Sequence, residues 1–107
     1  MTDMRFVITL RGECEVGQDA GEDAKQLAMA LADTGNVEYN REGGYIVFRQ
    51  ERTLDGHPLE AVGEAIQSLR ALLDLAQIPA PYALGIEVQE LVAIGAGQFT
   101  RGRRFSA

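Results

Sequence analysis

The chain has 107 residues, of which 46% are hydrophobic, and its formal net charge at pH 7 is −6. This length suffices for one domain with a single core, and the apolar content excludes a disordered chain. One cysteine cannot form an internal disulfide, and no apolar run is long enough to span a bilayer, so we expect a cytoplasmic protein without a membrane anchor.

The stretch Met4–Val16 predicts the first strand. Its even positions are mostly apolar, whereas its odd positions are polar except for Val7. Alternate side chains of a strand point to opposite faces, so the even set faces a core and the odd set faces a wetter surface. We expect this strand to end between Arg11 and Glu15, with Gly12 marking a bulge or a bend.

A helix is predicted after the loop at residues 17–19. Apolar residues recur at helical spacing from Ala20 to Leu31. Asp19 followed by Glu22 fits a capping box in which Asp19 replaces the usual Ser or Thr. Gly35 is the residue that we expect to end this helix.

Residues 36–51 predict a β-hairpin. Segments 36–40 and 45–51 are rich in β-branched and aromatic residues. Gly43 and Gly44 lie between them and accept the positive φ that a tight turn requires. Residues 52–57 are expected to form a loop.

Pro58 opens the second predicted helix, because proline is well tolerated at the first helical position. Apolar residues at alternating spacings of three and four extend this helix to about Leu75. Pro79 and Pro81 prevent its continuation.

A fourth strand is predicted to begin at Tyr82–Val88, where apolar residues again alternate. The alternation breaks at Glu90, and Leu91–Ile94 is a continuous apolar run. This break indicates either a bulge or a short helical turn.

The predicted order of elements is β-α-β-β-α-β, which favours an α+β fold of the ferredoxin-like, two-layer sandwich type. Four antiparallel strands would stand in the order 4-1-3-2 with both helices on one face. We expect residues 1–97 to form this single domain and residues 98–107 to form a basic C-terminal tail.

The uncovered face of this sheet is the first candidate interaction surface. Open faces of this kind often pair with a second copy or bind a partner. The residues expected there are Arg5, Val7, Thr9, Arg11 and Tyr45. We therefore expect a homodimer or another protein partner.

The basic tail is the second candidate surface. Residues 1–100 contain 16 acids and 7 bases, whereas the last seven residues contain three arginines and no acid. The acidic body should repel nucleic acid, while the tail can attract phosphate or an acidic protein surface. The expected contact residues are Arg101, Arg103, Arg104 and Phe105.

No group of residues indicates catalysis. A Cys14 nucleophile with a His57 base would require both side chains in one exposed pocket, but Cys14 is in phase with the core, and His57 flanks a helix start. One Cys and one His cannot complete a structural zinc site, and the glycines match no phosphate-binding motif. The sequence therefore predicts no catalytic residue, no metal site and no cofactor.

Two short stretches of the chain resemble parts of known regulatory or binding domains. Residues 41–48 superficially resemble the third-strand signature of RNA-recognition domains, but Gly43 stands where a stacking aromatic residue belongs. Gln18-Asp19-Ala20-Gly21, the helix that follows and Thr34-Gly35-Asn36-Val37 are similar to the first half of ACT regulatory domains, without the usual Pro before the loop glycine. The latter resemblance implies an amino-acid site, usually across a dimer, at Gln18, Asp19 and Gly21.

Three functions are thus expected. The first is a small, non-enzymatic protein-interaction or assembly module, with an acidic inhibitor or adaptor as its sharper version. The second is an ACT-like domain that senses a small molecule. The third is a small enzyme of the dimeric α+β barrel type that uses the open face as a pocket.

Overall fold

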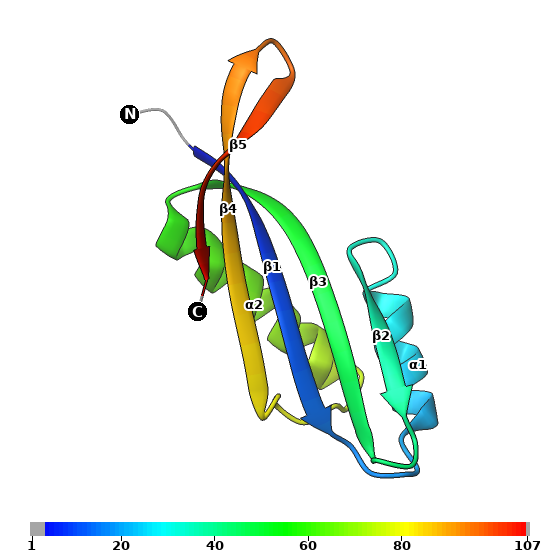
Figure 1. The fold of residues 1–107 in the computed structure, drawn as a ribbon. Helices are drawn as coiled ribbons and strands as arrows, with labels where there is room; N and C mark the ends of the chain where they lie inside the picture. Colours follow the sequence, from blue (N-terminus) through cyan, green and yellow to red (C-terminus); the bar gives the residue numbers. More distant parts are fainter. Residues whose placement is uncertain (1–3, 107) are drawn as a thin grey trace.

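The computed structural model describes residues 4–106 (Figure 1). Its five strands form one antiparallel sheet in the order β2-β3-β1-β4-β5. The elements in chain order are β1 (Met4–Glu15), α1 (Gly21–Ala30), β2 (Gly35–Asn40), β3 (Tyr45–Gly56), α2 (Pro58–Leu75), β4 (Ala83–Gly95) and β5 (Gln98–Ser106). Residues 1–3 and 107, which the sequence analysis assigned to the domain and the tail, lie outside the described residues.

β1 lies at the centre of the sheet, as expected for the first strand. It pairs with β3 along its whole length and with β4 on its other side. Pairing is continuous through Gly12, so the bulge expected there as one alternative does not form. Glycine meets a different need at this position, because a Cβ there would overlap the ring of Phe48.

The hydrophobic core lies between one face of the sheet and the helices α1 and α2 (Figure 1). The even positions of β1 face this core, as the alternation predicted. On α2, small and large apolar residues recur every fourth position and pack against the sheet. The core residues of these elements are Phe6, Ile8, Leu10 and Cys14 of β1, Leu27 of α1, Ile46 and Phe48 of β3, and Ala61, Ala65, Leu69 and Leu73 of α2.

The start of α1 differs from the prediction. The residue before the helix is Ala20, whose side chain cannot accept a hydrogen bond, so the capping box expected from Asp19 and Glu22 is wrong. The hydroxyl of Tyr39 accepts a hydrogen bond from the Ala20 amide instead, at 3.2 Å. A residue distant in sequence therefore replaces the local cap.

The end of α1 also differs. The helix stops at Ala30, and Gly35 is the first residue of β2 rather than the end of the helix. A Cβ at Gly35 would overlap the carbonyl group of Arg49 on β3. The glycine is therefore required for the close approach of two strands.

The predicted hairpin is confirmed as β2 and β3, and Gly44 in its turn has a φ of 68°. β3 continues to Gly56, so the loop expected at residues 52–57 is mostly strand. α2 runs from Pro58 to Leu75, as predicted. His57 caps it, since its Nδ1 accepts a hydrogen bond from the Leu59 amide at 3.3 Å.

The predicted fold class is wrong. The sheet has five strands instead of four, and its order is not that of a ferredoxin-like sandwich. The physical reason is that β4 extends to Gly95 and turns back at Gly97, whose φ of 72° suits a tight turn. Residues 98–106, expected as a tail, then pair with β4 as β5. The division into a domain and a tail remains a prediction.

None of the helices within residues 4–106 has the length and apolar character of a membrane crossing.

Candidate functional site

The most distinctive surface is a two-stranded arm that projects beyond the rest of the sheet (Figure 1). The pairing of β4 with β1 ends at Leu91, opposite Arg5. β4 continues alone with β5, through the pairs Val92 with Thr100 and Ala93 with Phe99. We call residues 92–100 the arm.

Both faces of the arm carry apolar side chains. Ala93 and Phe99 are paired and share a face with Leu91, whereas Val92 points to the opposite face and Ile94 lies within the register shift that follows. The exposed fractions are 40% for Val92, 64% for Ile94 and 41% for Phe99. The continuous apolar run is therefore strand, which removes the helical-turn alternative. The register between β4 and β5 shifts at Gln89/Leu91 and again at Ala93/Gly95.

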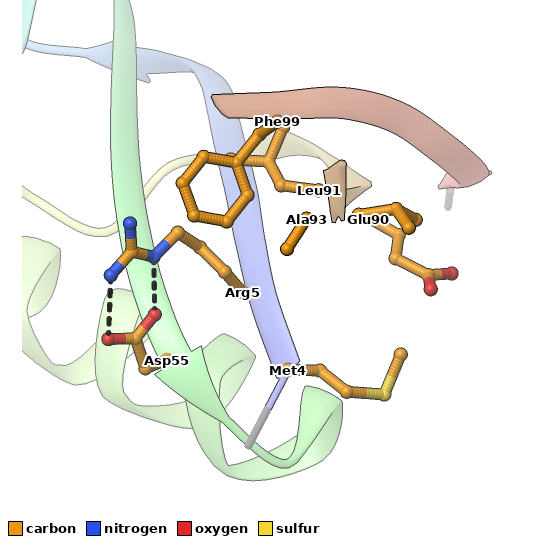
Figure 2. Close-up of a pocket in the computed structure, with 8 residues that line it drawn as sticks. Met4, Arg5, Asp55, Glu90, Leu91, Ala93 and Phe99 are labelled. Carbon is orange, nitrogen blue, oxygen red and sulfur yellow. Dashed lines mark hydrogen bonds and ion pairs between the residues drawn. The ribbon is translucent and has the colours of Figure 1, made fainter. Parts of the chain in front are cut away.

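A hollow of about 470 Å³ lies at the base of the arm (Figure 2). It is lined by Met4, Arg5, Asp55, Leu91 and Phe99, among others. Its lining combines the Arg5–Asp55 ion pair and Glu90 with apolar side chains, and it contains no Ser, Thr, Cys or Lys. Within residues 4–106, no group of His, Cys, Asp and Glu side chains could hold a metal ion.

Arg5 joins the arm to the sheet at this hollow. Its Nε donates a hydrogen bond to Oδ1 of Asp55 at 2.7 Å, and its guanidinium carbon lies 4.8 Å from the centre of the Phe99 ring. This hydrogen bond is the main cause of the lowered pKa of Asp55. Because both charged groups are exposed, the pair positions Phe99 more than it stabilises the fold.

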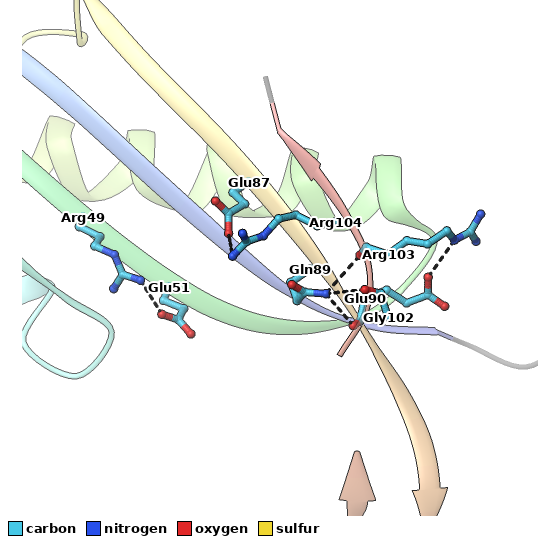
Figure 3. A network of polar contacts seen from close by, with 8 residues as sticks. All are labelled: Arg49, Glu51, Glu87, Gln89, Glu90, Gly102, Arg103 and Arg104. Carbon is cyan, nitrogen blue, oxygen red and sulfur yellow. Dashed lines mark hydrogen bonds and ion pairs between the residues drawn. The ribbon is translucent and has the colours of Figure 1, made fainter. Parts of the chain in front are cut away.

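The other side of the base is fixed by a polar network around a bulge in β5 (Figure 3). The Nε2 atom of buried Gln89 donates to the Gly102 carbonyl at 2.9 Å and lies 3.3 Å from the Arg103 carbonyl. Arg103 forms an ion pair with Glu90 at 3.2 Å. This buried amide thus satisfies its hydrogen bonds by joining β5 to β4 at the base of the arm.

The structure places the predicted open-face residues on the sheet face away from the helices, but it does not gather them into one site. Arg5 lies beside the arm, and Tyr45 lies at the other end of β1, paired with Glu15. Thr9, in the middle, is only 7% exposed. Val7 and Arg11 lie on either side of Thr9 along the same face.

The predicted tail residues are all on β5. Arg104 forms an ion pair with Glu87 at 2.9 Å, like that of Arg103 with Glu90 (Figure 3). Phe105 pairs with Val88 on the helix side of the sheet and is half exposed. Internal ion pairs thus neutralise part of the positive charge that was expected to attract phosphate or an acidic partner.

The loop that resembles ACT domains lies at the far end of the molecule. Gln18, Asp19 and Gly21 are exposed. The Nε2 atom of Gln18 lies 3.4 Å from the carbonyl of Glu42, and the hydroxyl of Tyr39 donates to the Gly17 carbonyl at 3.0 Å. The loop is thus joined to β2 and its turn. The ligand site proposed for it remains a prediction.

Cys14 and His57 lie at opposite ends of the sheet. Cys14 pairs with Ile46, whereas Gly56, the neighbour of His57, pairs with Met4. Ten strand residues separate these positions, which is roughly 30 Å. Burial also raises the pKa of the Cys14 thiol to about 11. The two residues therefore cannot act as a nucleophile and base together.

Val92, Ile94 and Phe99 of the arm are not among the surface residues predicted from the sequence. The signal was present in the run Leu91–Ile94, because a strand that is apolar at successive positions needs cover on both faces. No protein-family model, curated protein or solved structure matches this chain.

Proposed function

We propose that this chain is a small protein-interaction and assembly module that docks through its arm. The observation that carries the proposal is a projecting two-stranded ribbon with exposed apolar side chains on both faces. A two-stranded ribbon has no core of its own. Its apolar side chains can leave water only when another surface covers them.

Covering the arm would supply part of the free energy that association requires. Fully burying a side chain such as Val, Ile or Phe contributes about 1.5–3 kcal/mol. Val92, Ile94 and Phe99 each retain 40% to 64% of their exposure, so covering all three would contribute on the order of 3 kcal/mol. Micromolar binding requires about 8 kcal/mol in total, so the arm would supply a large part and the surrounding surface the rest.

The other functions expected from the sequence have less geometric support. The ACT-like loop uses its polar groups within the chain, and the open sheet face is crossed by ion pairs such as Arg49 with Glu51 (Figure 3). A thermal-shift panel of amino acids and nucleotides would test the ligand-sensing alternative, which predicts a raised melting temperature with one of them.

The proposal is tested by capture with immobilised protein, comparing wild type with Ile94→Asp. The matched control is Leu59→Asp, since Leu59 is 78% exposed on α2, outside the arm. We expect wild type and control to retain the same protein, either a further copy or another chain, and Ile94→Asp to lose it. Equal retention by all three proteins, or no retained protein at all, would contradict the proposal.

A further inference from the structure

We infer that the arm binds a second copy of this chain, in a pair in which the two molecules run antiparallel. The inference rests on the proposed function and names its partner. In this arrangement, the arm of each copy covers an apolar groove between α2 and β4 of the other copy. Three features of the chain support the assignment.

The first feature is the groove itself, which has a volume of about 340 Å³. It lies where the core is incompletely covered, beside Leu84, whose side chain is 39% exposed. Apolar side chains dominate its lining, with Arg70 and Asp74 as its charged members. The principal apolar lining residues are Ile66, Leu69, Leu73, Ile78, Pro81 and Leu84. Like the arm, this surface gains from being covered.

The second feature is the position of the two surfaces. The molecule is elongated, with extents of 49 × 23 × 20 Å. Leu84 lies near the start of β4 and Ile94 near its end, roughly 30 Å apart along one strand. The arm cannot reach the groove of its own chain. When two copies lie antiparallel, each arm reaches the end of the other copy that carries the groove.

The third feature is charge. Three arginines lie on β5, next to the arm, and Arg101 forms no ion pair within the described residues. The groove lining itself carries one charge of each sign, Arg70 and Asp74, and Glu13, which accepts a hydrogen bond from Tyr82, lies at the same end on the opposite face of the sheet. Residues 1–100 as a whole hold 16 acids and 7 bases. A second copy therefore offers a surface of complementary charge to the basic end.

Two-fold symmetry also favours the antiparallel pair. Each copy contributes one arm and one groove, so an antiparallel pair satisfies both surfaces twice and closes. A head-to-tail contact of the same surfaces would leave one arm and one groove uncovered and would continue into a filament. The closed pair leaves neither surface exposed.

The test uses single-cysteine additions in the full chain. Native Cys14 is fully buried and leaves the surface thiol-free in the described residues. Ile94→Cys and Leu84→Cys proteins are mixed in equal amounts under mild oxidation. We expect the mixed disulfide between arm and groove to dominate over both like pairs. The matched control, Leu59→Cys, replaces an exposed residue at the arm end of α2 and should form little mixed disulfide with Ile94→Cys.

Sedimentation and light scattering supply a second measurement. Wild type should be a dimer, and Ile94→Asp should raise its dissociation constant at least about tenfold, while Leu59→Asp changes it less than about twofold. Disulfides that form preferentially between two Ile94→Cys chains would show arm-to-arm pairing and overturn the inference while leaving the proposed function intact. A monomer whose arm retains a different protein would overturn it in the same way. A monomer that retains nothing would refute both.

Discussion

Replacing Gly35 with alanine should destabilise the fold, whereas the same change at Gly63 should stabilise it. At Gly35 the new Cβ would lie 2.8 Å from the carbonyl carbon of Arg49 and 2.9 Å from Cα of Gln50, and it would overlap the Arg49 oxygen. These are backbone atoms, so no side chain can rotate away and β2 must shift. Overpacking of this kind costs about 1–3 kcal/mol, and the smaller unfolded-state entropy of alanine offsets only about 0.4–1 kcal/mol.

Gly63 is the matched control. It lies inside α2, and a Cβ there would meet no heavy atom within 4 Å. Alanine is favoured over glycine in a helix interior by about 1 kcal/mol. The two variants should therefore differ in free energy of unfolding by about 1–4 kcal/mol, with Gly63→Ala the more stable.

Urea unfolding followed by circular dichroism measures both changes. We expect Gly35→Ala to lower the transition midpoint and Gly63→Ala to raise it, with similar slopes. A Gly35→Ala midpoint equal to that of wild type would show that β2 and β3 do not approach as closely as described, and would refute this account of the sheet edge.

Two further predictions concern packing and titration. Leu27→Ala should cost about 2–5 kcal/mol in unfolding free energy, because Leu27 is fully buried. Met29→Ala, at a position that is 65% exposed, should stay within about 0.5 kcal/mol of wild type. Equal losses of unfolding free energy in the two variants would contradict the assigned buried face of α1. The pKa of Tyr82 is raised to about 12, chiefly by the 2.6 Å hydrogen bond that its hydroxyl donates to Glu13. The phenol therefore contributes stability that is complete below about pH 10 and is lost as the pH rises towards about 12. Glu13→Ala should lower this pKa in a tyrosinate absorbance titration, and an unchanged titration would remove the contact with Glu13 as its cause.

The sequence predicted those elements whose pattern and local chemistry agree. The alternation of β1 identified its buried face, and Pro58 with a regular apolar stripe located α2 correctly. Prediction failed where a distant residue replaces a local signal. Tyr39 caps α1 from β2, and Arg49 on β3 requires a glycine at position 35. Neither contact is visible before the hairpin is placed beside the helix.

The candidate surface was missed for a related reason. The basic segment after Gly97 was interpreted by its charge and expected as a tail, although it also pairs with β4. Gln89 binds its backbone at Gly102, and Glu87 and Glu90 pair with two of its arginines. These acids lie on β4, so the excess positive charge of the segment is partly matched by its own neighbour. Charge counted along the chain does not show this.

The placement of the arginines bears on how the arm can associate. β5 is an edge strand, and an exposed edge beside an apolar ribbon invites uncontrolled strand pairing. Arg101, Arg103 and Arg104 lie along this edge, and the bulge fixed by Gln89 interrupts its regular pairing. Both features disfavour the addition of another strand. Association is then left to the side chains of the arm, such as Ile94, which fit a groove better than an open-ended sheet. The edge therefore favours docking through side chains over strand-to-strand assembly.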